Sequence, residues 1–189
     1  MHGSRRARGF TIIELLMVLI LIGVLVAFAA PRIDLIGHRA NGAMQGVGTT
    51  LLAAQRLALT RQHDVVVVFD DVAGVVRVHD DGNDNGVVDA GEHVSVTPLG
   101  DLVVFGLGGA PPLDGGAGAV TFTRTEGGRP AVTFHRSGSA SESGVAYLTS
   151  RRAMANSGFA EDTRAIQVER ATGRASWYRY RPSGWQRGF

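Results

Sequence analysis

Hydrophobic side chains form one uninterrupted run near the start of the chain, from Phe10 to Ala30, in which Glu14 is the only charged residue. A helix of this length rises about 31 Å, which matches the hydrocarbon thickness of a bilayer. The pattern therefore predicts a membrane-spanning helix over residues 10–30. The arginines just before this run are expected to stay in the cytoplasm, which would place the rest of the chain outside it.

Two other interpretations of this run are open from the residues alone. An ordinary secretory signal ends at a small-residue cleavage site, and Ala27-Phe28-Ala29 supplies such a pattern. A plain single-span anchor needs only the hydropathy of the segment. Neither interpretation requires a glutamate near the start of the run, and a charged group within a membrane is retained only where it has a partner.

Beyond Pro31, apolar and small residues recur in steps of three and four, which is the period of one helix face. They are Ile33, Ile36, Ala40, Ala43, Val47, Leu51, Ala54 and Ala58. The pattern predicts that an amphipathic helix over residues 31–63 continues the first as one long helix, with its second half packed on a domain. Glycines at positions 37, 42, 46 and 48 each cost about 1 kcal/mol relative to alanine, so a flexible or partly melted stretch is expected around residues 37–48.

From residue 64 the period changes to that of strands, in short β-branched runs separated by glycine, proline and aspartate. The predicted strands are Val65–Phe69, Val75–His79, Val94–Thr97, Leu102–Leu107, Val120–Arg124, Ala131–His135, Val145–Thr149, Ala165–Arg170 and Ser176–Arg181. One helix followed by many short strands indicates an α+β fold with antiparallel sheets packed on the helix. Gly106–Gly118 and Ser137–Ser143 are predicted to be loops, and the first of them to be mobile.

Charge and composition change this picture in two respects. The chain has 189 residues and 19 basic side chains, all arginine, against 17 acids. Three of these arginines precede Gly9, so removal of the first nine residues would leave one more acid than base. A charge balance this close to zero identifies neither a nucleic-acid binder nor an enzyme for acidic substrates. The lack of cysteine excludes disulfides, thiolate metal sites, lipoprotein anchoring and cysteine nucleophiles.

An acidic stretch between two predicted strands, residues 81–92, matches the pattern of a calcium-binding loop in every specified position. The expected oxygen ligands for Ca²⁺ are Asp81, Asn83, Asn85, the carbonyl group of Val87, Asp89 and Glu92. Strands rather than helices flank this loop, and turns rich in Asp, Asn and Gly match the pattern by chance. A plain solvated turn is therefore the alternative.

Residues 151–189 contain eight arginines against three acids. Guanidinium groups beside aromatic rings suit a nucleic-acid backbone and its exposed bases. The candidate DNA-binding residues are Arg174, Arg179, Arg181 and Arg187, and the aromatic residues among them are Trp177, Tyr178, Tyr180 and Trp185. The alternative is an edge strand whose stacked arginines prevent self-pairing.

No catalytic constellation stands out in the sequence. The six histidines are scattered, and His135, which is close to Ser137 and Ser139, has no sequence sign of an orienting acid. A lone strand histidine is more often structural. We therefore predict that the protein is not an enzyme.

The hexapeptide Gly9-Phe10-Thr11-Ile12-Ile13-Glu14 resembles the cleavage and assembly motif of type IV prepilins and type II secretion pseudopilins. Pro31 extends the resemblance, because such helices often carry a proline there. The resemblance implies that prepilin peptidase cuts between Gly9 and Phe10 and methylates the new amine. It also implies that Glu14 pairs with the N-terminal amine of a neighbouring pilin in a filament.

The rest of the chain resembles the GspH/FimT branch of this family in three segments. They are Ala53-Ala54-Gln55-Arg56-Leu57-Ala58, Val132-Thr133-Phe134-His135-Arg136-Ser137-Gly138, and Val168-Glu169-Arg170-Ala171-Thr172-Gly173-Arg174. Members of the FimT branch that take up DNA carry a Gly-Arg-x-Arg motif in this C-terminal region. Here the sequence is Gly173-Arg174-Ala175-Ser176, so the second arginine is missing.

Together these patterns predict a pilin-like α+β protein. Its expected parts are a leader (1–9), a membrane and assembly helix (10–30), an amphipathic helix (31–63) and a β-rich domain outside the cytoplasm (64–189). The resemblance implies a minor pilin or pseudopilin of the bacterial inner membrane, built into a type IV pilus or a type II secretion pseudopilus. The alternatives are a pilus-associated DNA receptor for transformation and a membrane-anchored calcium sensor.

Overall fold

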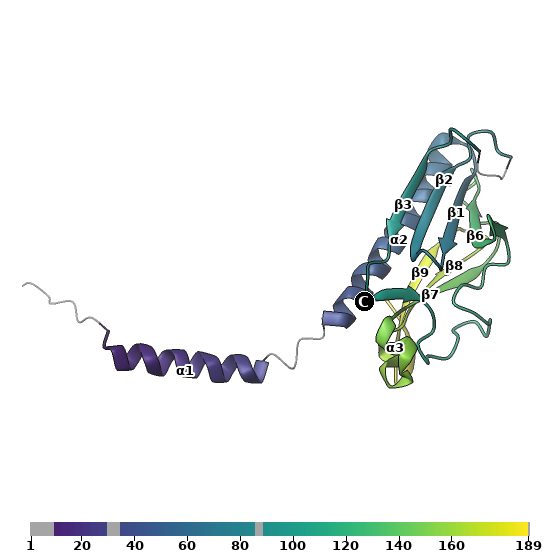
Figure 1. The fold of residues 1–189 in the computed structure, drawn as a ribbon. Coiled ribbons are helices and arrows are strands. Elements are labelled where there is room, and N and C mark those ends of the chain that lie inside the picture. Colours follow the sequence, from purple (N-terminus) through teal and green to yellow (C-terminus); the bar gives the residue numbers. More distant parts are fainter. Residues whose placement is uncertain (1–9, 30–34, 86–88, 189) are drawn as a thin grey trace, which may run out of the picture. The chain divides into compact units, whose positions relative to one another are not determined.

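The computed structural model describes residues 10–29, 35–85 and 89–188 (Figure 1). The chain divides into two compact units, Met1–Leu35 and Ile36–Phe189. Pro31 and the other residues between the two N-terminal helices lie outside the described part. The predicted continuity of one long helix through this point therefore stays a prediction.

Helix α1 (Ile12–Ala29) is apolar around its whole circumference, with Glu14 in its first turn. Within the described residues, no helix combines the length and the apolar character needed to cross a membrane. The spanning role predicted for residues 10–30 therefore stays a prediction.

Helix α2 (Leu35–Arg61) confirms the predicted amphipathic pattern, because the apolar residues at helical spacing lie on its buried face. The partly melted stretch predicted around residues 37–48 is wrong, since this stretch is regular helix. Packing outweighs the low helix propensity of glycine here: a Cβ at Gly48 would lie 3.5 Å from the ring of Trp177. The helix backbone at Gly48 therefore packs directly on the ring of Trp177, and Ala40, Met44 and Val47 of the same stretch are buried.

Two five-stranded antiparallel sheets follow, in agreement with the predicted α+β class. Sheet 1 has the order β3-β2-β1-β6-β5 and sheet 2 the order β10-β9-β8-β7-β4. The strands of sheet 1 are β1 (Val65–Asp70), β2 (Val75–Asp80), β3 (Val94–Pro98), β5 (Thr125–Glu126) and β6 (Arg129–Phe134). Those of sheet 2 are β4 (Val103–Phe105), β7 (Gly144–Ser150), β8 (Arg164–Val168), β9 (Ala175–Arg181) and β10 (Gly184–Arg187).

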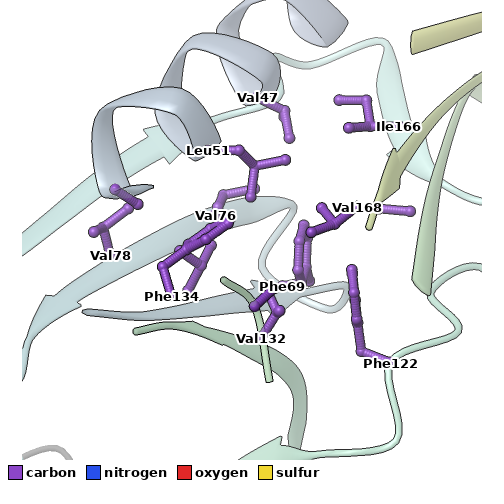
Figure 2. Packing of buried hydrophobic residues seen from close by; sticks show 14 of the residues in the cluster. Val47, Leu51, Phe69, Val76, Val78, Phe122, Val132, Phe134, Ile166 and Val168 are labelled. Atoms are coloured by element: carbon purple, nitrogen blue, oxygen red, sulfur yellow. The ribbon is translucent and has the colours of Figure 1, made fainter. Parts of the chain in front are cut away.

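The main core fills the space between α2 and the two sheets. Figure 2 shows Val47 and Leu51 of α2 directed toward side chains of both sheets, among them Phe69 of sheet 1 and Ile166 of sheet 2. All four side chains are at most 1% exposed. Burial of this apolar surface is the main stabilising term for the domain.

The strand predicted at Val120–Arg124 is wrong, although Val120 makes one isolated bridge to Ala146. The carboxylate of Glu142 accepts hydrogen bonds from the backbone N–H groups of Thr123 (3.0 Å) and Arg124 (2.8 Å) and from the hydroxyl of Thr123 (2.7 Å). Backbone groups bound to a side chain are not available to a strand ladder. Burial alone raises the pKa of Glu142, but these three hydrogen bonds outweigh it, so the pKa lies below its ordinary value.

Two short helices between β7 and β8 were not predicted, α3 (Arg151–Ala155) and the 3₁₀ helix η2 (Ser157–Asp162). Asp162 joins them to the sheet, because its carboxylate accepts two hydrogen bonds from Arg152, at 2.7 and 2.9 Å, and one from Ser150. Burial raises the pKa of Asp162, and the bonds from Arg152 and Ser150 more than reverse this effect, so the carboxylate has a lowered pKa.

A fully buried arginine connects α2 to sheet 2. Arg164 of β8 is 0% exposed, and its Nε donates to Oδ1 of Asn41 at 2.7 Å. One of its terminal nitrogens donates to the carbonyl groups of Glu161 (2.7 Å) and Thr163 (3.0 Å). The guanidinium group therefore fixes the first half of α2 to the segment that contains η2.

Candidate functional site

The start of α1 is a closed hydrogen-bonded cap made by Thr11 and Glu14. Oε2 of Glu14 accepts from the backbone N–H and from the hydroxyl of Thr11, both at 2.8 Å. The hydroxyl of Thr11 in turn accepts from the backbone N–H of Glu14 at 3.3 Å. This reciprocal arrangement is a capping box, in which a threonine before the helix and a glutamate three residues later satisfy each other's free N–H groups.

Two residues of the predicted cleavage and assembly motif, Phe10 and Glu14, lie at the start of this apolar helix. Phe10 is 86% exposed, and Glu14 lies in the first turn, where the helix dipole favours a negative charge. Gly9 lies outside the described residues. Thr11 was not singled out from the sequence, although a threonine followed three residues later by a glutamate before an apolar run is a known capping signal.

The three segments that resemble the GspH/FimT branch meet at one side chain of α2. The amide nitrogen Nε2 of Gln55 donates to the carbonyl group of Gly138 at 2.7 Å and to that of Thr172 at 2.8 Å. Gly138 follows β6 of sheet 1, and Thr172 lies in the turn between β8 and β9 of sheet 2. One amide group on the helix therefore holds a connecting segment of each sheet.

Gly173 completes this junction. It has φ +62°, and a Cβ there would lie 2.2 Å from the carbonyl oxygen of Gly138 and 2.6 Å from Nε2 of Gln55. Both its backbone conformation and its surroundings therefore require glycine. The role of this junction is structural, since the amide nitrogen of Gln55 bridges two backbone carbonyl groups.

The acidic loop between β2 and β3 places most of the predicted calcium ligands close together. The amide groups of Asn83 and Asn85 donate to Oδ2 of Asp89 at 2.8 and 2.6 Å. Asp81, at the start of the loop, is buried, with 1% of its surface exposed. Oε2 of Glu92 accepts from the backbone N–H of Asp89 at 3.0 Å. Val87 lies outside the described residues. In the part of the chain that the structure describes, no three His, Cys, Asp or Glu side chains are placed to hold a metal ion. Calcium binding therefore stays a prediction.

Ca²⁺ is expected to raise the melting temperature of the full chain, because an ion that binds only the folded loop stabilises it by about 2.7 kcal/mol at a hundredfold excess over Kd. Asp81→Ala should abolish the rise, and Asp101→Ala, an exposed aspartate in another turn, should leave it unchanged. Thermal unfolding in calcium and in chelator measures both. Identical melting curves for the unmodified chain would make the loop an ordinary turn.

The four candidate DNA-binding arginines do not form one patch. Side chains of a strand alternate between the two faces of its sheet, and Arg179 lies opposite Arg164, on the face turned to α2. Arg181 lies on this same face and forms an ion pair with Glu161 at 3.2 Å. Arg187 lies on the opposite face, where it donates to the hydroxyl of Ser176 at 2.9 Å.

The aromatic residues of β9 and β10 pack within the domain. Trp177 is partly buried and packs against the main core, and Trp185 contacts Tyr147 and Tyr180 with ring centroids 5.9 and 5.4 Å apart. Nε1 of Trp185 also donates to the carbonyl group of Pro111 at 2.9 Å. The loop Gly106–Gly118 is thus irregular, as predicted, and is hydrogen-bonded to the outer face of sheet 2. These rings are held by other contacts and do not form an open stacking platform.

His135 has an orienting acid that the sequence did not reveal. Its Nδ1 lies 2.8 Å from Oδ2 of Asp64, the residue directly before β1. The hydroxyl groups of the two nearby serines, Ser137 and Ser139, pair with each other at 2.8 Å. The Asp64–His135 pair fixes the turn after β6 to the turn before β1, which is a structural role.

Comparison with protein families identifies the N-terminal segment. The model of the prokaryotic N-terminal methylation motif matches residues 4–30. Comparison with curated proteins and with solved structures gave no match. The matched segment contains the predicted cleavage point and the Thr11–Glu14 cap, and it ends before the β-rich domain, so it does not establish the GspH/FimT branch. The chain carries the type IV prepilin-like methylation signal at residues 4–30.

Proposed function

We propose that the protein is a minor pilin or pseudopilin, a structural subunit of a type IV pilus or a type II secretion pseudopilus. The observation that carries this proposal is the match of residues 4–30 to the methylation motif. The leader ends at Gly9, residues 10–30 hold the precursor in the inner membrane, and the β-rich domain lies outside the cytoplasm. After cleavage, α1 enters the filament together with the helices of other pilins.

The chemistry of Glu14 supports this role. A carboxylate inside a membrane costs about 2.5–3.5 kcal/mol on insertion scales, so it needs a partner. Both hydrogen bonds from Thr11 reach the same oxygen, Oε2, and they are made by neutral groups, so the negative charge remains. The N-terminal amine of a neighbouring subunit neutralises this charge when the helices pack in a filament.

Processing tests the proposal directly. In cells that contain prepilin peptidase, the mature protein is expected to begin with N-methylated Phe10. Intact mass and N-terminal peptide spectra of membrane-extracted protein measure the cut and the methyl group together. A matched variant, Gly9→Leu, should keep its leader. An unprocessed wild-type chain, or a mature N-terminus near Ala30, would contradict the proposed function.

A second function, DNA binding during transformation, is favoured by one observation. Arg174 and Arg187 line the same surface hollow as the hydroxyl groups of Ser176 and Tyr178. Two guanidinium groups beside hydroxyl groups suit a phosphodiester backbone. Glu169 lines this hollow too and opposes an anion.

We expect the full chain to bind duplex DNA more weakly than about 10 μM near physiological salt, in the non-specific range. Arg174→Ala and Arg187→Ala should each reduce the magnitude of the salt slope by about one unit. Arg181→Ala, on the other face, should leave the slope unchanged. Gel shifts at two salt concentrations measure these slopes, and no shift at low salt would exclude this second function.

A further inference from the structure

Exposed apolar side chains gather at one end of the β-rich domain, around α3 and η2. Leu102 is 37% exposed, Met154 56% and Phe159 41%. The backbone N–H of Arg151 donates to the carbonyl group of Leu102 at 3.0 Å, so the residue before β4 lies beside the start of α3. The guanidinium carbon of Arg152 lies 4.6 Å from the ring centre of Phe159. We call these five residues the end surface.

Helix α3, which carries three residues of the end surface, lies at the end of the domain where α2 begins (Figure 1). Arg164 shows this connection directly, because it binds Asn41 in the second turn of α2 and the carbonyl group of Glu161 in η2. Strand β2 leads toward the opposite end of the domain, where its last residue, Asp80, precedes the acidic loop (Figure 1).

The chain tethers this end of the domain to any membrane that holds residues 10–30. Helix α2 begins at Leu35, five residues after position 30. Since an extended residue spans at most ~3.6 Å, this connection reaches no more than about 18 Å. The first turn of α2 therefore stays within that distance of the point where the chain leaves the bilayer.

The charge of this end suits an anionic surface. Arginines that reach the solvent outnumber the acids in the second turn of α2, in the segment before β4, in α3 and η2, and at the end of β9. The arginines are Arg39, Arg151, Arg152 and Arg181, and the acids are Asp101, Glu161 and Asp162. Glu161 and Asp162 are paired with Arg181 and Arg152. Arg151 is exposed.

We propose that the end surface rests on the anionic lipid headgroups of the membrane while the subunit awaits assembly. This inference rests on the proposed function, because it requires residues 10–30 to lie in the bilayer. Apolar side chains flanked by arginine insert shallowly into the headgroup region while the guanidinium groups bind lipid phosphates. Contact of this kind orients the domain, with the acidic loop directed away from the lipid.

The test uses the full chain, which contains no cysteine. Met154→Cys places a single label site on the end surface, and Ala90→Cys places a matched control on the exposed acidic loop. Both proteins are labelled with an environment-sensitive fluorophore and reconstituted in vesicles of phosphatidylethanolamine and phosphatidylglycerol. The label at position 154 should show a blue shift and protection from a water-soluble quencher, and the label at position 90 should show neither.

Electrostatics gives a second readout. Adding Arg151→Gln to Met154→Cys should reduce the equilibrium constant for the protected state about fivefold at low salt, since one arginine near an anionic surface contributes that factor. Purely zwitterionic vesicles of phosphatidylcholine should give little protection.

Equal emission and equal quenching at positions 154 and 90 in membrane-bound protein would overturn the inference and leave the proposed function standing. Protection of position 154 only after other pilins are added would also overturn it, in favour of a subunit contact. Failure of the chain to enter vesicles at all would contradict the proposed function itself.

Discussion

Gly173→Ala is expected to lower the free energy of unfolding by about 3 kcal/mol. The left-handed conformation contributes about 1 kcal/mol of this loss, and the clash of a Cβ with Gly138 and Gln55 the remainder. A melting temperature lower by about 6–12 °C should accompany it, because each kcal/mol shifts a domain of this size by about 2–4 °C. Thermal and urea unfolding of the detergent-solubilised chain measure both quantities.

Gly74→Ala is the matched control for this prediction. Gly74 has φ +67°, close to the +62° of Gly173, but a Cβ there would meet nothing within 4 Å. The control should lose only the conformational part, about 1 kcal/mol. If the two variants lose the same stability, the contacts at the Gln55 junction do not constrain the fold as the structure indicates.

Glu14→Ala is expected to be cleaved and methylated normally and to be absent from sheared filaments. Without the carboxylate, nothing in the first turn of α1 neutralises the amine of a neighbouring subunit, and the protein should remain in the membrane fraction. Immunoblots of sheared filaments and of membranes measure this distribution. Incorporation of Glu14→Ala at the level of the unmodified chain would contradict the proposed pairing.

Thr11→Ala separates this pairing from the helix cap. The variant keeps the carboxylate and the backbone N–H bond to Oε2. It loses both hydrogen bonds of the Thr11 hydroxyl, the one donated to Oε2 and the one accepted from the backbone N–H of Glu14. Loss of a cap costs about 1 kcal/mol of helix stability. We expect a modest reduction of incorporation for Thr11→Ala, compared with complete loss for Glu14→Ala. Equal losses would show that the cap, rather than the charge, is what assembly requires.

The spacing of apolar residues predicted the fold well in the elements where burial of apolar side chains is the dominant interaction. The α+β class, the amphipathic face of α2 and most strands follow from the burial of apolar residues at regular spacing. The melted stretch at 37–48 was wrong because propensity counts glycine as a cost and leaves out packing, whereas one face of this stretch is buried in the domain. The strand at Val120–Arg124 was wrong because a carboxylate distant in sequence, Glu142, binds its backbone.

Among the candidate sites, those built from local contacts could be predicted from the sequence, and those built from residues distant in sequence could not. The Thr11–Glu14 cap is local and has a sequence signal. Gln55 is separated from its two partners by 83 and 117 residues, and no local pattern predicts such contacts. The sequence also does not predict which side chains of β9 face α2, because this depends on the order and register of the strands in the sheet.

The junction at Gln55 also has a mechanical consequence. In the proposed filament, tension on a subunit would arrive through its N-terminal helix, and α2 would pass that load to the domain. Thr50 binds Thr97 of sheet 1 at 2.9 Å, Asn41 binds Arg164 of sheet 2, and Gln55 binds a connecting segment of each. Attachments in parallel share the load, so a pull along the helix does not peel one strand at a time. Because the chain has no cysteine, we expect this sharing to take the place of a covalent cross-link when the domain is pulled.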